Sequence, residues 1–395
     1  SQWVLISTVL DDGLPGDGAS TYTTAYDYGT PFYSRAEREF FGFNKVMETR
    51  NDGSAVERTF ENHDYHKKGL QYTEILRDKP GHVWSRTENT YEIRDLGAPT
   101  YQPLFPDQNY DDSHKDQLHV KFPMLTATTR HFYTGKTTDP AVSSKSTAQN
   151  FEYDDYGNIN LFVDRADEGT TDDVYATIAY WTDPQDNYIV GKPETIRVTD
   201  NSRSNVYRER KAVYQNGTGN MTELSMLIQG STNAVWNMEY DPDTGNLAKI
   251  TYPAGAPSHN TRNDRYFITY QYDPQVETYV TGISDAFGYS SAADYKYEFG
   301  QPNWTKDING NYQVNEYDDF GRMVKIYGAY DTDEAGSPVC PPSLTFAYDV
   351  PVIKDDMSVP VVPAGAVTRN KSASSNTCSG DIITTATFVD GMKRM

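Results

Sequence analysis

Residues 295–328 read YKYEFGQPNWTKDINGNYQVNEYDDFGRMVKIYG, and this stretch sets the pattern for the rest of the chain. Three turn signals, each ending in Gly, separate short runs rich in Tyr, Trp, Val and Ile. In the third signal, the Asp318 side chain can accept a hydrogen bond from a backbone N–H group two residues on, which nucleates a turn. Gly321 can adopt positive φ without a Cβ clash. We therefore interpret residues 317–322 as the loop of a β-hairpin and expect much of the chain to repeat this unit.

The composition favours strands and turns. The 395 residues include 31 Tyr, 28 Gly and 21 Pro, whereas only 37% of the residues are hydrophobic. The Tyr ring is apolar and its tip is polar, so Tyr suits half-solvated sheet surfaces better than dry cores. Strand-favouring residues combined with many turn residues predict an all-β protein, and the length allows one very large domain or two to three ordinary ones.

The chain is strongly acidic. Its 56 acidic and 35 basic residues give a formal charge of −21. Such a field repels nucleic acid and anionic membrane surfaces, so we expect no nucleic-acid partner and no membrane-surface binding. No apolar run of 18 residues occurs, so no direct membrane span is predicted, and the first residues lack the pattern of a signal peptide.

Cys340 and Cys378 are the two cysteines of the chain, and they flank a stretch rich in Pro and Ser. They could form one disulfide in an exported protein, but two unrelated thiols would have the same spacing. They do not form a metal site by themselves.

The first segment, residues 1–135, is β-rich, but its strands and turn signals do not follow the pattern of residues 295–328. Ser34, with Glu37 three residues later, predicts a short helical turn over residues 34–39. The Pro- and Asp-rich residues 96–116 predict an irregular loop. Residues 134–149 are polar and predict a domain boundary, although a long hairpin loop would have the same composition. Strands are predicted at residues 3–10, 21–27, 45–50, 55–61, 71–77, 83–93 and 119–133.

The hairpin unit recurs over residues 136–395. Residues 151–161 have the same layout as residues 317–324, and residues 239–250 repeat it with one extra loop residue. Residues 388–395 begin another unit, so we expect the repeat region to be truncated at its C-terminus. Such self-similarity predicts stacked antiparallel β-hairpins that bury surface against their neighbours and form part of a large curved sheet or hollow shell. The predicted residues of the structural repeat motif are Tyr153, Asp154, Gly157, Tyr240, Asp241, Gly245, Asp285, Gly288, Asp307, Gly310, Tyr317, Asp318, Gly321, Arg322, Asp390 and Gly391.

Two motifs resemble a known family. Tyr-Asp-x-x-Gly followed by Arg or Asn and an apolar strand resembles the YD repeat of Rhs proteins, which occur in polymorphic toxins, toxin complexes and teneurins. YDYG at 26–29, FYSRAEREFFGF at 32–43 and HKKGL at 66–70 resemble the region after the β-propeller in the B component of insecticidal toxin complexes. Together the two resemblances cover most of the chain.

The resemblance implies a shell. In this family, hairpins of YD repeats spiral into a hollow cocoon that encloses a toxic polypeptide until delivery. The expected partners are other parts of the shell-forming chain and a toxin-bearing C-like component with its enclosed polypeptide. The chain lacks the propeller, the terminal core motif cut by the partner's aspartyl protease, and a toxin tail, so we expect a non-catalytic part of the wall. The resemblance implies a bacterial protein that is secreted or displayed on the cell surface.

No catalytic motif, cofactor motif or metal-ligand motif appears in the sequence. His63 and His66, like His114 and His119, match no ligand spacing, and we interpret them as polar surface residues. Residues 164–168 and 241–245 imitate only part of a calcium loop, so we interpret them as turns. We therefore expect no enzymatic activity, no cofactor and no metal.

One alternative function belongs to a different class. Exposed Tyr and Trp residues, Trp236 and Trp304 among them, could stack on sugars in an extracellular adhesion or carbohydrate-binding module. In either case, a partial spiral leaves unpaired sheet edges, so we expect edge-to-edge self-association of this chain.

Overall fold

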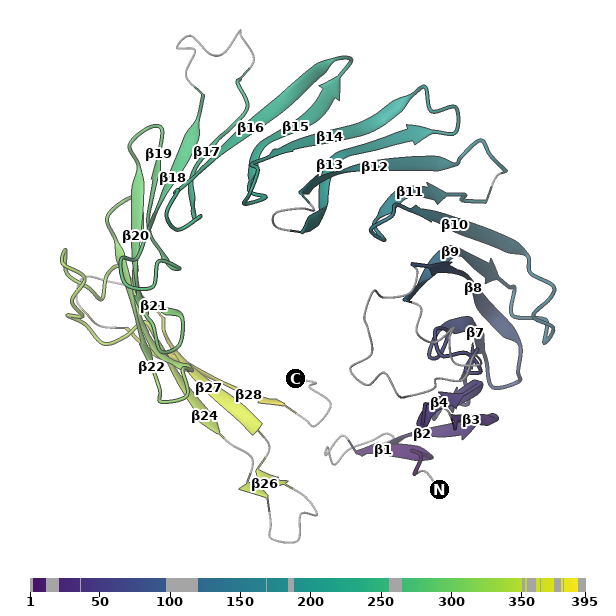
Figure 1. Ribbon diagram of the computed structural model, residues 1–395. Helices are drawn as coiled ribbons and strands as arrows, with labels where there is room; N and C mark the ends of the chain where they lie inside the picture. Colours follow the sequence, from purple (N-terminus) through teal and green to yellow (C-terminus); the bar gives the residue numbers. More distant parts are fainter. Residues whose placement is uncertain are drawn as a thin grey trace, which may run out of the picture. The chain divides into compact units, whose positions relative to one another are not determined.

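The computed structural model shows an all-β protein, which confirms the predicted fold class (Figure 1). None of the described residues forms a helix that is long and apolar enough to cross a membrane. The structure describes residues 3–11, 21–35, 37–96, 120–167, 169–183, 188–255, 265–349, 352–353, 360–362, 364–372, 378 and 380–389.

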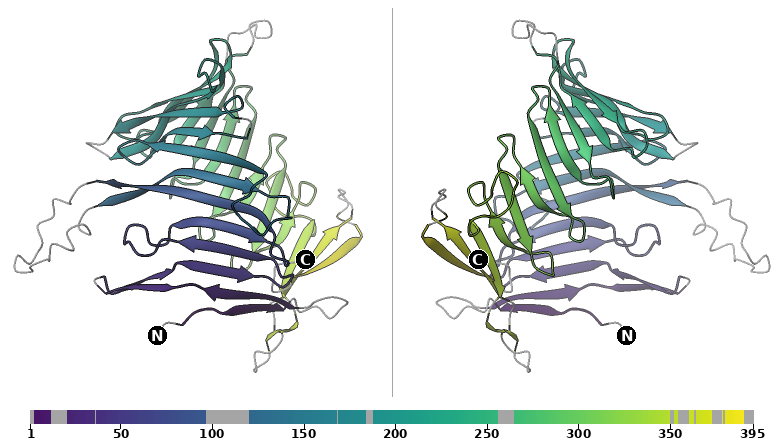
Figure 2. Two further views of the ribbon diagram at one scale, coloured as in Figure 1. Left: turned by 90° about the vertical axis from the view of Figure 1, so that its right-hand side faces the viewer. Right: turned by 90° about the vertical axis from the view of Figure 1, so that its left-hand side faces the viewer.

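The chain divides into two compact units. The first comprises Ser1–Leu10 and Thr21–Ala212, and the second comprises Asp11–Ser20 and Val213–Met395. In each unit, the strands lie side by side in one layer (Figure 2). Almost every strand pairs antiparallel with the next strand along the chain, so each unit is a ladder of hairpins.

The ladder of the first unit runs in the order β1, β2 and then β5 to β14, while β3 and β4 form a separate hairpin. Its strands are β1 (Ser7–Asp11), β2 (Thr21–Tyr28), β3 (Pro31–Ser34), β4 (Glu39–Phe43), β5 (Lys45–Thr49), β6 (Ala55–Phe60), β7 (Gln71–Arg77), β8 (Val83–Asp95), β9 (Lys121–Phe132), β10 (Lys145–Tyr153), β11 (Ile159–Asp164), β12 (Val174–Asp183), β13 (Ile189–Asp200) and β14 (Val206–Tyr214).

The ladder of the second unit runs from β15 to β24 and continues with β27 and β28, while β25 and β26 form a separate pair. Its strands are β15 (Met221–Gln229), β16 (Thr232–Tyr240), β17 (Leu247–Thr251), β18 (Phe267–Tyr272), β19 (Val280–Asp285), β20 (Ser290–Lys296), β21 (Gln301–Lys306), β22 (Tyr312–Tyr317), β23 (Met323–Tyr327), β24 (Leu344–Asp349), β25 (Val352–Ile353), β26 (Pro360–Val362), β27 (Ala364–Lys371) and β28 (Ile382–Val389).

Burial is thin because each unit is one sheet thick. The one cluster of contacting buried apolar residues in the described part of the chain consists of Ile75, Val83 and Tyr133, and Val83 is fully buried. Most other strand residues are half-buried, since side chains on each face are covered mainly by those of neighbouring strands. Stability must therefore come from contacts between adjacent strands.

Most predicted strands of the first segment are present, but two predictions fail. The predicted helical turn over residues 34–39 is wrong, because β3 and β4 form a hairpin there. Ser34 Oγ does accept a hydrogen bond from the Glu37 N–H (3.2 Å), as a capping residue would, yet the chain then turns back. The predicted strand at residues 3–10 begins only at Ser7, and Trp3 is fully exposed.

The polar residues 134–144 connect β9 to β10, which pair with each other from Lys145 opposite Phe132 to Asn150 opposite Ala127. This stretch is therefore the loop of a hairpin. The division into a segment of residues 1–135 and a repeat region of residues 136–395 remains a prediction about repeat type. The predicted irregular loop at 96–116 lies, apart from residue 96, outside the described residues.

We predict that two glycines with the same backbone conformation differ in their tolerance of a side chain. Gly321 has φ +76° and Gly288 has φ +86°, but an added Cβ would lie 2.8 Å from Phe299 Cδ1 at Gly321 and would meet open space at Gly288. Gly288→Ala should cost about 1–2 kcal/mol of unfolding free energy, which is the cost of positive φ alone. Gly321→Ala should cost more because Phe299 must move, as urea denaturation can measure. Equal losses would contradict this packing.

Candidate functional site

The recurrent feature of the molecule is a hairpin turn organised by one carboxylate. Asp318 Oδ1 accepts hydrogen bonds from the N–H groups of Phe320 (3.0 Å) and Arg322 (2.9 Å). The N–H of Gly321 donates to the Asp318 carbonyl (3.0 Å), and the Asp318 N–H donates to the Arg322 carbonyl (2.9 Å). Arg322 Nε also donates to Asp318 Oδ2 (2.7 Å). The side chain thus satisfies backbone groups that the turn removes from the ladder.

The same turn recurs along both units. In every copy, the residues two and four positions after Asp donate to one carboxylate oxygen, and Gly at the third position has a φ between 76° and 86°. The further copies begin at Asp154, Asp285, Asp307 and Asp333.

Two further turns are wider variants. Asp241 accepts hydrogen bonds from the N–H groups of Asp243 and Thr244, and Gly245 has φ +75°. Asp273 has no Gly in its loop, and Glu277 takes the positive φ instead (54°). The Asp273 residue is 1% exposed, and its two carboxylate oxygens accept five backbone N–H groups, from Gln275, Val276, Glu277, Thr278 and Tyr279.

The predicted motif residues do not gather at one place. Each Asp–Gly pair of the motif that the structure describes lies in a separate turn. Asp390 and Gly391 lie outside the described residues. The copy that begins at Asp333 was not predicted from the sequence, although Gly336 lies three residues later. Nor was the related turn at Asp78, where Pro80 has no N–H to donate and the His82 N–H alone donates to Asp78 Oδ1 (2.7 Å). The turn at Asp200 gives no glycine signal, because Arg203 takes the positive φ there.

The Tyr of the motif links one hairpin to the preceding strand. Tyr317 lies at a β-bulge, because Glu316 is opposite Lys325 whereas Tyr317 is opposite Met323. Its hydroxyl donates to the carbonyl of Pro302 (2.9 Å) on β21, the strand before. The residue therefore pairs with the following strand through its backbone and with the preceding strand through its side chain.

This link is more widespread than the Tyr-Asp motif. Among the residues that the structure describes, a bulge and a hydroxyl-to-carbonyl bond of 2.8–3.2 Å occur together at six tyrosines. Two of these, Tyr91 and Tyr180, are not followed by Asp. Burial raises the pKa of Tyr240 and Tyr317, so both hydroxyls remain protonated donors at neutral pH. The full set is Tyr91, Tyr153, Tyr180, Tyr240, Tyr272 and Tyr317.

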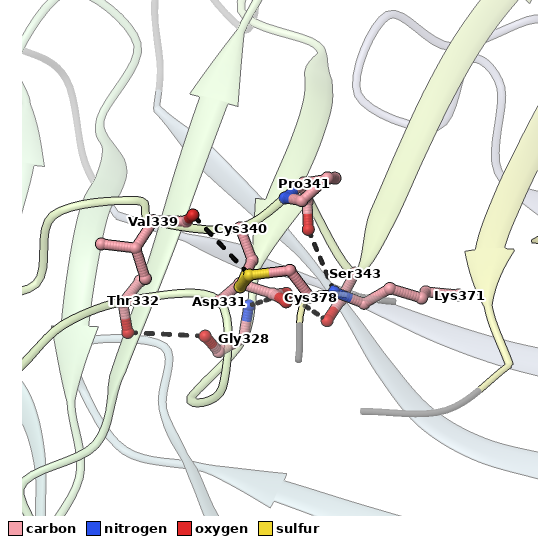
Figure 3. The surroundings of a disulfide bond; sticks show 9 residues. All are labelled: Gly328, Asp331, Thr332, Val339, Cys340, Pro341, Ser343, Lys371 and Cys378. Atoms are coloured by element: carbon pink, nitrogen blue, oxygen red, sulfur yellow. Dashed lines mark hydrogen bonds and ion pairs between the residues drawn. A yellow bond between two sulfur atoms is a disulfide. The ribbon is translucent and has the colours of Figure 1, made fainter. Parts of the chain in front are cut away.

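A covalent and ionic clasp holds the last strands of the second unit together (Figure 3). Cys340 and Cys378 form a disulfide with their Cα atoms 5.0 Å apart, which settles the pairing that the sequence left open. Beside it, the buried Lys371 ammonium pairs with the buried Asp331 carboxylate. Asp331 Oδ2 also accepts hydrogen bonds from Ser343 Oγ (2.5 Å) and the Gly328 N–H (3.0 Å).

The clasp joins two connections that are far apart in the sequence. The disulfide spans 38 residues, and closing a loop of that length stabilises a fold by about 4 kcal/mol in the chain-entropy model. Burial alone would raise the pKa of Asp331, but Lys371, Ser343 and the Gly328 N–H lower it. Asp331 is therefore a buried, paired anion whose role is to hold the loop.

The shifted pKa values of two further aspartates have their cause in the hairpin turns. The pKa of Asp241 and Asp307 is lowered by backbone N–H groups of their own turns. No group of three or more His, Cys, Asp or Glu side chains in the described part of the chain could hold a metal ion. His63 packs edge-on against Phe32 (4.7 Å between ring centroids), in an aromatic cluster around the β3–β4 hairpin.

Solved structures share this fold. The crystal structure of TcdB2-TccC3 matches 95% of this chain and 26% of its own, with 13% identity and a TM-score of 0.67. The crystal structure of TcdB2-TccC3-Cdc42 matches 95% of this chain and 28% of its own, with 12% identity and a TM-score of 0.68. A structure of the Photorhabdus luminescens Tc holotoxin pore matches 95% and 27%, with 12% identity and a TM-score of 0.67. The chain thus spans about a quarter of the length of the chains it matches.

A family model matches the first part of the chain by sequence. Residues 2–74 match the model described as "Insecticide toxin TcdB middle/N-terminal region". A search of curated proteins finds no match. The predicted resemblance to the shell region of a toxin-complex B component is therefore confirmed, by sequence over residues 2–74 and by fold over 95% of the chain.

We predict that Tyr317→Phe destabilises the protein by about 1 kcal/mol, because it removes one hydroxyl-to-carbonyl hydrogen bond and keeps the ring. Tyr330→Phe is the matched control, since the Tyr330 side chain is 55% exposed. Urea denaturation of both variants measures the difference. An unchanged stability of Tyr317→Phe would show that the link contributes nothing.

We predict that the second unit loses stability in acid. Burial alone would raise the pKa of Asp273, but the backbone N–H groups of Val276, Tyr279, Thr278 and Gln275 lower it well below the ordinary value of 3.8. A group whose pKa is lower in the folded state contributes stability above about pH 4, and this contribution is lost as the pH falls through the folded pKa. The thermal midpoint should therefore begin to fall below about pH 4 and continue to fall as the pH approaches the folded pKa.

Asp273→Asn should lower the midpoint at neutral pH and weaken its dependence on acid, because an amide cannot accept all five hydrogen bonds. Asp319→Asn removes the same charge from an exposed position next to Asp318 and is the control. An acid dependence that is identical in Asp273→Asn and in the unsubstituted chain would contradict this assignment.

Proposed function

We propose that this chain is a non-catalytic wall segment of a toxin-complex shell, which encloses a toxin polypeptide for delivery. The observation that carries the proposal is the hairpin ladder, one layer thick in each unit, which matches toxin-complex structures over 95% of the chain. A ladder of this kind can be lengthened by adding hairpins, since each strand needs only its neighbours. It can therefore enclose a volume with little protein.

The absence of a recognisable reactive site among the described residues fits this role. Perturbed pKa values usually point to functional sites, but structural networks perturb them as well. Here the lowered pKa values of Asp241, Asp273 and Asp307 trace to backbone N–H groups of hairpin turns. These three carboxylates are thus occupied by their own loops.

The proposed partners follow from the same comparison. They are the remaining parts of the shell-forming protein and a toxin-bearing C-like component with its enclosed polypeptide. The exposed sheet edges make association between copies of this chain a further part of the proposal. The Cys340–Cys378 disulfide favours an oxidising compartment, which supports secretion or display at the cell surface.

The two tryptophans named for the carbohydrate-binding alternative do not favour it. Trp236 and Trp304 are partly buried within their strands, and the Trp304 ring packs edge-on against Tyr312 (5.3 Å between centroids). A platform for stacking a sugar needs an exposed aromatic face.

The test uses the full-length protein that contains this chain, assembled with its toxin-bearing partner. The toxin polypeptide should resist a protease in the intact complex. It should become cleavable under mild urea in a Tyr317→Phe/Gly321→Ala variant at concentrations where the Tyr330→Phe control still protects it. Cleavage that is equally fast with and without this shell protein would contradict enclosure. Glycan binding that is lost on Trp304→Ala would favour the alternative instead.

A further inference from the structure

The ion pair of Lys371 and Asp331 is withdrawn from water. The Lys371 side chain is 7% exposed and the Asp331 side chain 1%, whereas every other ion pair of the described residues has at least one partly exposed partner. The two residues are 40 positions apart in the sequence. Taking two opposite charges out of water costs free energy that their attraction repays only in part. The burial of this pair therefore favours any reaction that removes both charges.

The Asp331 carboxyl group is held in an arrangement that suits attack on its carbon. Ser343 Oγ (2.5 Å) and the Gly328 N–H (3.0 Å) both donate to Asp331 Oδ2 (Figure 3). The Lys371 ammonium donates to the other oxygen, Oδ1. Two donors that converge on one oxygen stabilise the negative charge that forms there when a nucleophile adds to the carbon. The Lys371 nitrogen is such a nucleophile once it loses a proton, and the fold holds it beside the carboxyl group.

The surrounding polar groups would also satisfy an amide between the two side chains. Its carbonyl oxygen would be Oδ2, which already has Ser343 Oγ and the Gly328 N–H as donors. Its N–H would have the Pro341 carbonyl as acceptor, which lies 3.1 Å from Lys371 Nζ. An ammonium carries three N–H donors, and within the described part of the chain it has two acceptors here. The site thus matches the hydrogen-bonding groups of an amide more fully than those of an ammonium.

We infer that Lys371 and Asp331 condense into an amide bond, a second covalent link beside the disulfide. The ion pair is the reactant. A proton passes from Nζ to Oδ1, the neutral Nζ then adds to Cγ, and the negative charge forms on Oδ2. Nζ gives a second proton to Oδ1, which leaves as water with the electrons of its bond to Cγ, and Oδ2 becomes the amide carbonyl oxygen. The reaction needs no co-reactant, occurs once per chain and does not depend on the proposed role in a shell.

The ionisation of Asp331 sets the pace of this reaction. Burial alone would raise its pKa, but its ion-pair and hydrogen-bond partners lower the pKa below the ordinary value. The first proton transfer therefore costs free energy, and the bond should form slowly once the chain has folded. It should then persist, because the buried site excludes the water that hydrolysis requires.

The test measures the intact mass of the 395-residue chain by mass spectrometry after denaturation and complete reduction. The mass should be lower than that of the sequence by one water molecule. A protease digest of the reduced chain should contain a branched peptide that joins Asp331 to Lys371. The branched peptide is essential, because an aspartate that cyclises onto its own backbone also loses one water.

Three variants separate the amide from an ion pair. Lys371→Arg keeps the positive charge but has no primary amine, so it should retain the full mass of its sequence. Lys325→Arg is the matched control, because Lys325 pairs with Glu316 (2.6 Å) at an exposed position and its substitution should leave the water loss unchanged. Ser343→Ala keeps both reacting groups and removes one donor to Oδ2. The cross-linked fraction should then rise on the order of 100-fold more slowly in samples taken at intervals after expression begins.

The outcomes decide the inference. A folded, disulfide-bonded chain with the full mass of its sequence would overturn it, and so would a water loss that persists in Lys371→Arg or a digest without the branched peptide. A cooperative thermal transition shows which variants are folded. If Lys371→Arg does not fold, Ser343→Ala still supplies the test, and formation of the cross-link at an unchanged rate would overturn the step assigned to Oδ2.

Discussion

The hydroxyl-to-carbonyl hydrogen bond of a tyrosine at a β-bulge is the interaction on which these ladders depend. A sheet one layer thick has no opposing layer to bury its faces, so adjacent strands must supply the stability. Tyr317 pairs with β23 through its backbone and bonds to Pro302 of β21 through its hydroxyl, and it thereby joins three strands. The bulge matters because it changes the register at Tyr317, the residue whose ring spans the distance to the preceding strand.

The aspartate turns and the clasp meet a second requirement, which is that the chain must reverse direction between adjacent strands. Each hairpin must reverse in a few residues without leaving backbone N–H groups unpaired, and the Asp carboxylate accepts them. Where the connection is long, between β23 and β24, Asp331, Lys371 and the disulfide hold it in addition to the turn at Asp333. The acidic composition of the chain therefore reflects, in part, the number of its turns.

Much of this arrangement could be predicted from the sequence because it is local. Asp318 and Gly321 specify a turn by their own chemistry, and alternating aromatic residues specify the strands beside it. The prediction of a helical turn at residues 34–39 was wrong, because Ser34 can accept a hydrogen bond from an N–H group equally well in a hairpin loop. The links of Tyr91 and Tyr180 could not be predicted, because the carbonyls they bond lie about 20 residues away and no Asp marks them. The disulfide likewise depends on tertiary proximity that spacing alone cannot give.

If tyrosine links between neighbouring hairpins stabilise the ladder, the loss of one link should loosen the strands around it and leave distant strands unchanged. Amide hydrogen exchange of the Tyr317→Phe variant, read by mass spectrometry, tests this most directly. The account predicts faster exchange in β21 (Gln301–Lys306) and β22 (Tyr312–Tyr317), with β15 (Met221–Gln229) and β16 (Thr232–Tyr240) unaffected. Unchanged exchange in all four strands, or an equal increase in all of them, would contradict it.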